Sequence, residues 1–383
     1  MDLLTTAISM AQNALSIIIA LFGIGFLIGF HEFGHFLFCK LFDIKTPTFS
    51  IGFGPILYQR RVWDTDFTLS AIPLGGFVEI AGAAEVGQGE QKDAHSTDKD
   101  SFATKPYYQK FLVMTGGILC NLLFAYFAFI LLSLIGIPKT PLMPTQTKTV
   151  IQMVEPNGAA EAAGLQKGDK INQINDNIVS DNIHLLVETI QPLAQKEVKI
   201  NYERNGKAQE LILTVGHRKG SEGIGSIGVA FEMEEMPPLS FFNAVKQGIT
   251  LTNDWIVRTF TGIIGMFRKA DVKNVGGPVV IISMLTKGAT TSFSIFLILL
   301  AIISINLAVL NLIPLPILDG GQLLFYTIEA IIGRPLNPKV KEYIHITSWL
   351  LIMGLVLYLS VFDIARLAHP YVESVKQFLG FGR

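Results

Sequence analysis

The residues best suited to chemistry are His31, Glu32 and His35, in the run His31-Glu32-Phe33-Gly34-His35. Residues four apart share one face of a helix, so the two imidazoles point the same way and can bind one Zn²⁺. Glu32 lies beside them, where its carboxylate can take a proton from zinc-bound water and return one to a leaving amine. The alternative is a set of polar residues satisfied within a helix bundle.

Two histidines leave zinc short of its usual three protein ligands plus water. The best candidate for the third ligand is Asp319, the only charged residue between Lys287 and Glu329. Pro314 and Pro316 precede it and must interrupt the helix. Broken backbone at membrane depth is tolerated only when it is buried in protein or lines a wet cavity. The alternative for Asp319 is a cap on the helix that follows.

The composition indicates a multi-pass membrane protein. Half of the 383 residues are hydrophobic, 16% are charged, and the mean hydropathy is +0.45. Apolar stretches cover about 15–39, 111–138, 293–318 and 346–361, each near the ~20 residues that a spanning helix needs. The first stretch is too long for a signal peptide and has no Lys or Arg before it. The net charge of −1 gives no reason to expect nucleic acid as a partner.

The distribution of charge predicts the orientation. Residues 1–30 contain no Lys or Arg, whereas residues 40–110 contain eight. The positive-inside rule therefore places the 40–110 loop in the cytosol and the N-terminus outside. Four spans place 139–290 and the tail outside, whereas three would leave the tail inside, which its basic residues favour. His35 would lie ~7 Å and His31 ~13 Å inside the boundary marked by Lys40.

Other segments predict soluble or surface structure. Alternating residues at 48–58, 66–72 and 76–80 predict short strands near the membrane, and 85–105 reads as an exposed, mobile loop. Residues 146–231 predict a separate α/β domain with a helix near 183–193. After a linker at 232–238, residues 240–270 predict an amphipathic helix that lies on the outer membrane surface or packs on protein. Membrane parts are thus expected at 1–145 and 293–383, with the linker and surface helix at 232–292.

Several of these motifs together resemble a known family. The HEFGH run in a first span and the N-x-x-P-x-P-x-L-D-G-G run at 311–321 resemble the site-two protease family of intramembrane zinc metalloproteases (peptidase family M50). The run 158–178 resembles a bacterial PDZ domain, and Gly116-Gly117 with Asn121 resembles a family motif beside the active site. The branch that regulates sigma-E carries two tandem PDZ domains, whereas this chain has room for one.

The resemblance implies roles for individual residues. It implies that His31, His35 and Asp319 hold zinc and that Glu32 activates water. Asn311 would contact the substrate backbone, with a polar bundle contact as the alternative. From the residues we also expect Gly76, Phe77 and Val78 to bind an unwound substrate by strand addition.

The resemblance further implies partners and location. Expected substrates are single-pass transmembrane proteins or stubs trimmed first by a site-one protease, such as anti-sigma factors or signal-peptide remnants. The expected location is the bacterial inner membrane, in contact with lipid, with the active site toward the cytosol. The PDZ-like domain would lie outside and receive peptide C-termini or substrate ectodomains. Rival classes are a PDZ-bearing scaffold with a structural zinc site and a transporter, which would show internal repeats.

Overall fold

The computed structural model describes residues 3–83, 93, 96–140, 142–143, 147–218, 221–269 and 276–378. The chain forms two compact units. The membrane unit comprises Met1–Leu132 and Phe241–Arg383, and the sheet unit comprises Ser133–Ser240. Each unit has its own internal packing, so each is described by itself.

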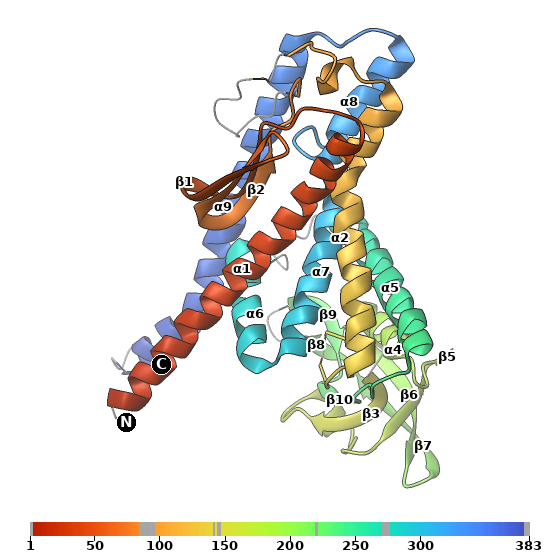
Figure 1. Cartoon of the computed structure of the whole chain (residues 1–383). Coiled ribbons are helices and arrows are strands. Elements are labelled where there is room, and N and C mark those ends of the chain that lie inside the picture. The colour runs from red at the N-terminus through yellow and green to blue at the C-terminus, as the bar shows by residue number, and fades with distance from the viewer. Residues whose placement is uncertain are drawn as a thin grey trace. The chain divides into compact units, whose positions relative to one another are not determined.

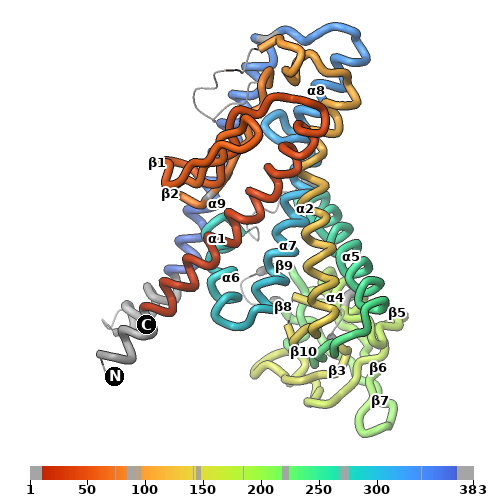
Figure 2. Tube along the Cα trace, in the orientation of Figure 1, coloured from red at the N-terminus to blue at the C-terminus, as the bar shows by residue number. Residues whose placement is uncertain are grey.

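Four helices among the described residues are long and apolar enough to cross a membrane, judged by length and composition. They are α1 (Leu3–Leu41), α2 (Tyr107–Ile135), α7 (Phe293–Asn311) and α9 (Pro338–Phe378), and Figures 1 and 2 show their paths. Two of these helices are longer than the apolar stretches that predict them: α1 begins before residue 15, and α9 extends well beyond 346–361. Polar residues in α1, such as Gln12 and Asn13, and charged residues in α9, such as Asp363, end an apolar stretch but do not end a helix.

The third predicted span is shorter than expected. Helix α7 ends at Asn311, and residues 312–318 are not helical before α8 (Asp319–Ile332) begins. Pro314 and Pro316 lack the N–H that a continuing helix needs. The predicted bound of 318 is therefore wrong, although the interruption itself was expected from the prolines.

Two helices lie between the sheet unit and α7 in the sequence, where one was expected. They are α5 (Phe241–Lys269) and α6 (Pro278–Thr291). Helix α5 contacts α7, and Leu251 and Thr252 on it are buried. Thr259 on α5 donates a hydrogen bond to Asn306 on α7 at 2.8 Å. One face of this amphipathic helix therefore packs on protein, which was one of the two readings.

A curled hairpin packs against α1. Strands β1 (Thr48–Val62) and β2 (Thr65–Val78) pair antiparallel, so two long strands replace the three short ones expected. The first residues of β1 pair on one side with 66–69 and on the other with Gly76–Val78. Segment 76–78 is thus an edge of the hairpin, and β2 is the part that contacts α1 most.

The loop expected at 85–105 lies partly outside the described residues, namely at 85–92 and 94–95. The described end of it is ordered. It contains the short helix η1 (Phe102–Thr104), and Phe102 is buried in a cluster with Phe36 and Ile80. The expectation of a wholly exposed segment is wrong there, because one aromatic side chain anchors it to the core.

The sheet unit is an α/β fold, and its main sheet has the order β10-β3-β4-β6-β7, with β5 paired to β4. These strands are β10 (Val229–Met233), β3 (Thr147–Val154), β4 (Lys170–Ile174), β6 (Glu197–Arg204), β7 (Lys207–Thr214) and β5 (Asn177–Ile178). The other elements are α3 (Ala159–Ala162), α4 (Ile183–Ile190), η3 (Gln191–Leu193), β8 (Gly216–Arg218) and β9 (Ser221–Ser226). Alternating residues of β6, Val198, Ile200 and Tyr202, enter the core beside Leu186 of α4.

Candidate metal centre

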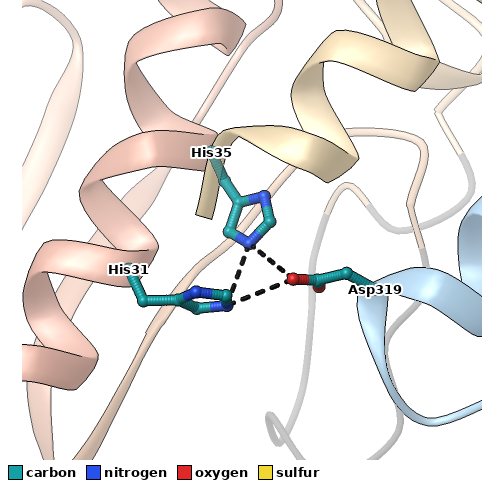
Figure 3. A group of neighbouring side chains, drawn as sticks. All are labelled: His31, His35 and Asp319. Atoms are coloured by element: carbon teal, nitrogen blue, oxygen red, sulfur yellow. Dashed lines mark hydrogen bonds and ion pairs between the residues drawn. The ribbon is translucent and has the colours of Figure 1, made fainter. Parts of the chain in front are cut away.

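Three side chains from two distant parts of the sequence meet inside the membrane unit (Figure 3). His31 Nε2 lies 3.2 Å and His35 Nε2 3.5 Å from Asp319 Oδ2, and the two Nε2 atoms are 3.3 Å apart. All three potential ligand atoms lie within 4.8 Å of one another. Both imidazoles are buried. Two imidazoles and a carboxylate are typical zinc ligands, and three such ligands leave a fourth position open.

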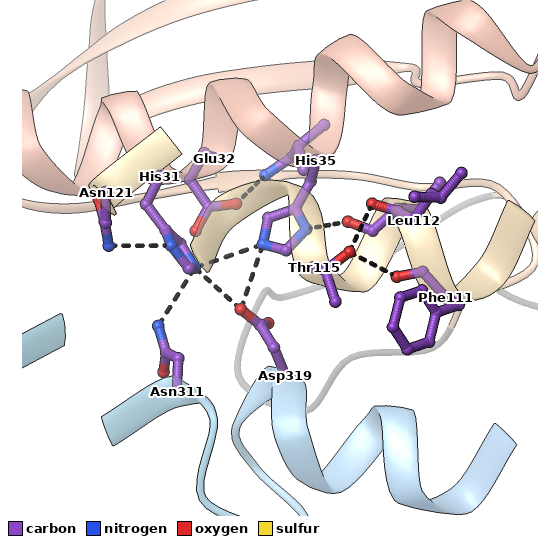
Figure 4. A network of polar contacts seen from close by, with 11 residues as sticks. His31, Glu32, His35, Phe111, Leu112, Thr115, Asn121, Asn311 and Asp319 are labelled. Carbon is purple, nitrogen blue, oxygen red and sulfur yellow. Dashed lines mark hydrogen bonds and ion pairs between the residues drawn. The ribbon is translucent and has the colours of Figure 1, made fainter. Parts of the chain in front are cut away.

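The ring of each histidine is oriented by helix α2 (Figure 4). His35 Nδ1 lies 2.8 Å from the backbone oxygen of Val113, so Nδ1 donates its proton there and Nε2 keeps a free lone pair for metal. His31 Nδ1 lies 3.2 Å from the Asn121 amide nitrogen. Asn121 Oδ1 is buried without a partner. Turning this amide by 180° brings Oδ1 to His31 Nδ1 as an acceptor and leaves His31 Nε2 free as well.

Helices α1 and α2 cross so closely that only glycine fits at the crossing. A Cβ on Gly34 would meet the backbone of Gly116, and a Cβ on Gly117 would meet both imidazole rings. The Gly116-Gly117 pair therefore lets α2 bring its backbone against the metal-facing side of α1. This packing explains how Val113 and Asn121 reach the two histidines.

Asp319 stands in the first turn of α8, and the helix N-cap is Leu318. Asp319 is therefore not the cap that the alternative reading required. A Cβ on Gly321 would overlap the backbone of Leu315, so glycine lets the first turn of α8 fold back on the proline segment. Asp319 Oδ2 is buried and has no hydrogen-bond donor assigned to it. A buried carboxylate oxygen that faces two imidazole nitrogens fits a cation, and the donor set fits zinc.

Glu32 lies beside the cluster rather than in it. Its Oε2 accepts a hydrogen bond of 3.2 Å from the backbone N–H of Val78 on β2. Glu32 also lines a cavity of about 250 Å³ together with His31, Asp319 and Asn311. The carboxylate is thus close to the candidate metal position without being one of the three grouped ligands.

Three of the four residues expected to bind substrate lie near the centre, namely Asn311, Gly76 and Val78. The Asn311 amide nitrogen lies 3.3 Å from His31 Nε2. A Cβ on Gly76 would lie 3.8 Å from Glu32 Cγ, so that glycine faces the same carboxylate as Val78. Phe77 points elsewhere, and its ring stacks on Phe53 at 6.4 Å between centroids.

Sequence reasoning missed the contribution of two residues to this centre. Val113 acts through its backbone oxygen, which no residue type reveals. Ser304 on α7 is buried and donates a hydrogen bond of 2.8 Å to the backbone oxygen of Asn121. A serine within a largely apolar span is a signal that could have pointed to it.

The fold and the site define a helical membrane protein with a zinc metalloprotease site. The model of Peptidase family M50 matches residues 19–355. The chain belongs to this family and is a zinc metalloprotease of the site-two protease type. The expectations of a metalloprotease, of zinc and of membrane helices are thereby confirmed.

Curated relatives match along nearly their whole length. The zinc metalloprotease RasP of Geobacillus kaustophilus is 30% identical over 93% of this chain and 99% of its own. A candidate zinc metalloprotease of Campylobacter jejuni is 34% identical over 90% of this chain and 92% of its own. Among solved structures, the PDZ domain of an SdrC-like protein from Listeria monocytogenes covers 22% of this chain and 87% of its own, at 21% identity and a TM-score of 0.20.

Proposed function

We propose that the protein is an intramembrane endopeptidase that cleaves single-pass transmembrane proteins or stubs trimmed first by another protease. The observation that carries the proposal is the position of Glu32, whose carboxylate lines the cavity beside His31, His35 and Asp319 without joining the ligand cluster. A structural zinc site has no use for such a carboxylate, whereas peptide hydrolysis needs a base beside the metal.

His31, His35 and Asp319 would hold one zinc ion per chain. Zinc, when bound, polarises water and the scissile carbonyl. Glu32 would accept the proton of the attacking water and deliver it to the nitrogen of the leaving amine. Asn311 would donate its amide N–H to the substrate backbone, because its nitrogen already lies at the cavity wall.

The hairpin edge at 76–78 would bind the unwound substrate as an added strand. An unwound segment exposes N–H and C=O groups that need partners inside the membrane. The Val78 N–H is donated to Glu32 rather than to β1. A substrate carbonyl that takes this N–H would release the Glu32 carboxylate for catalysis. Substrate binding and base activation would then be coupled through one hydrogen bond.

The variant Glu32→Gln tests the catalytic proposal. We expect cleavage of a model transmembrane substrate to fall by roughly 10²–10⁴-fold, the usual contribution of a general base, while zinc content stays unchanged. Cleavage at the wild-type rate would contradict the role of Glu32. A scaffold would keep its binding partners in both proteins.

The variant Val78→Pro tests strand addition, because proline removes the N–H that faces Glu32. We expect it to lower cleavage far more than zinc content. Val78→Ala is the matched control, since it trims the same buried side chain and keeps the N–H. Equal cleavage by the two variants would contradict strand addition.

The sheet unit would receive peptide C-termini or substrate ectodomains. A groove of about 610 Å³ lies between α4 and the segment 225–229, with Leu186 and Ile190 in its wall. Such grooves take extended peptides as an added strand. Binding of a fluorescent peptide with a free C-terminus, compared with its amidated form, measures this. Equal binding of the two peptides would contradict recognition of a free C-terminus. Binding of substrate ectodomains would then be the remaining role of the sheet unit.

The enzyme would lie in the bacterial inner membrane, with the 40–110 loop and the metal centre toward the cytosol and the sheet unit outside. This orientation is supported by the excess of Lys and Arg in residues 40–110, because loops rich in these residues stay in the cytosol. Single cysteines introduced at exposed positions such as Trp63 and Ile212 would report the two sides by labelling intact cells with an impermeant reagent.

A further inference from the structure

A polar pocket of about 340 Å³ lies in the membrane unit, at the opposite end of α8 from Asp319. Its wall includes Tyr107 and Lys110 from α2, Tyr326 and Glu329 from α8, and Arg334 from the turn that follows. None of these residues takes part in the metal centre. The pocket therefore needs an explanation of its own.

The pocket carries more positive than negative charge. Its carboxylate, Glu329, is already engaged, because Oε1 accepts from Lys341 Nζ and from the Leu336 N–H, both at 3.0 Å. Lys110 Nζ donates to a backbone oxygen, that of Ala103, at 2.9 Å. Neither Lys110 nor Arg334 has an ion pair within the part of the chain that the structure describes. Two cations and one engaged carboxylate thus give the pocket wall an excess of positive charge.

An aromatic ring holds the lysines in place. Lys110 Nζ lies 5.6 Å and Lys341 Nζ 5.1 Å from the centre of the Tyr326 ring, within the range of cation–π attraction. The Tyr107 hydroxyl is 2.8 Å from the Thr327 hydroxyl and so links α2 to α8. Lys110 is therefore positioned before any ligand arrives, which lowers the entropy cost of binding.

The pocket lies where two candidate spans begin. Tyr107 is the first residue of one, and the other starts at Lys339. Next to the pocket, on the last turn of α8, Ile331 and Ile332 are 80% and 50% exposed. Tyrosines and basic residues beside exposed apolar side chains are typical of the level where headgroups meet acyl chains.

We infer that this pocket binds the phosphate headgroup of an anionic phospholipid. Lys110 and Arg334 would contact the phosphate, and the exposed isoleucines would contact the acyl chains. The bound lipid would join α2, α8 and the start of α9 at one point. Because α8 begins at Asp319, the lipid would also hold the helix that presents this carboxylate.

The experiment uses the full-length protein in detergent and titrates phosphatidylglycerol, phosphatidylcholine or inorganic phosphate. Bound lipid is counted by native mass spectrometry, and the unfolding temperature is recorded in parallel. We expect only phosphatidylglycerol to bind and to raise the unfolding temperature. In Lys110→Met with Arg334→Gln, its apparent affinity should fall by roughly 30-fold, at about 1 kcal/mol for each charge.

Lys339→Gln is the matched control, since it removes one exposed charge at the same level but outside the pocket wall, and it should bind lipid as the wild type does. Arg334→Gln alone should lower the apparent affinity for phosphatidylglycerol about fivefold. Because Arg334 is exposed, this single variant remains a valid test if the double variant does not fold. Equal losses in Lys339→Gln and Arg334→Gln would overturn the inference. Inorganic phosphate that competes fully would show a site for free anions and would also overturn it.

Discussion

Two aspartates, one in each unit, have opposite surroundings: Asp169 is fully buried, whereas Asp319 is half-buried and lines a cavity. Asp169 in the sheet unit accepts hydrogen bonds of 2.7 Å from Arg204 Nε and Nη2 and from the Gln166 N–H. Asp319 in the membrane unit faces the Nε2 atoms of His31 and His35, and its Oδ2 has no assigned donor. The first carboxylate has its partners within the fold, whereas the second still needs a cation.

The comparison shows how a structural carboxylate differs from a functional one. A buried charge is tolerated only when it is paired and hydrogen-bonded. Asp363 on α9, also buried, meets this condition by accepting from the N–H groups of Gly277 and Val280 at the start of α6. Asp319 instead faces two imidazole nitrogens, a set of donors that can hold a cation together with it. Burial by itself therefore does not identify a site, but a buried carboxylate oxygen that faces two imidazole nitrogens does.

The largest effect is expected for Asp319→Asn. The amide is a poor zinc ligand, so zinc affinity should fall by more than about 100-fold, beyond the usual effect of an outer-shell change, and cleavage should fall with it. Zinc content by atomic absorption and cleavage of a transmembrane substrate measure this. Full zinc occupancy in the variant would show that Asp319 is not a zinc ligand and that its role, like that of Asp169, is structural.

The next effect is expected for Asp169→Asn. The amide cannot accept both Arg204 donors, so the guanidinium loses its counter-charge and the sheet unit should lose about 3 kcal/mol of stability. Denaturant unfolding of the full chain measures the loss. Zinc content should stay at the wild-type level, and a change in it would contradict the division between the two aspartates.

A smaller effect on zinc affinity is expected for Asn121→Leu, because Asn121 contacts a zinc ligand and is not itself a ligand. His31 would lose its Nδ1 partner, and zinc affinity should fall by about 10-fold, at the low end of outer-shell effects. Competition with a chelator measures the affinity. Asn121→Asp is the control, because its carboxylate keeps an acceptor for the His31 N–H and should keep most of the affinity.

The smallest effect is expected for an exposed ion pair of the sheet unit, Lys148 Nζ with Glu234 Oε1. The hydrogen bond to Glu234 raises the pKa of Lys148 above 10.5. Any stabilisation is thus present below about pH 10.5 and is lost as pH rises through the higher folded pKa. Glu234→Gln should leave the unfolding temperature at pH 7 almost unchanged, since water screens such pairs. A large fall in the unfolding temperature would show that this exposed pair stabilises the sheet unit as the buried Asp169 does.

Much of the fold followed from local pattern. Four apolar stretches predicted four long helices because spanning requires length and hydrophobicity, which composition records. The bounds were less accurate, since α9 continues through charged residues, and α6, with 14 residues, is too short to stand out as a span. Strand pairing depended on non-local partners, so the double pairing of β1 with both ends of β2 was not visible in the sequence.

The sequence by itself determined which residues can bind metal and that they share a helix face, because i and i+4 spacing is a local property of His31 and His35. It also singled out Asp319 as the lone charge in a broken span. Only the tertiary structure decided that Asp319 meets those histidines, that Val78 donates to Glu32, and that Gly117 makes room for both rings. Those contacts join segments up to nearly 300 residues apart, and such distances are decided by packing and not by local propensity.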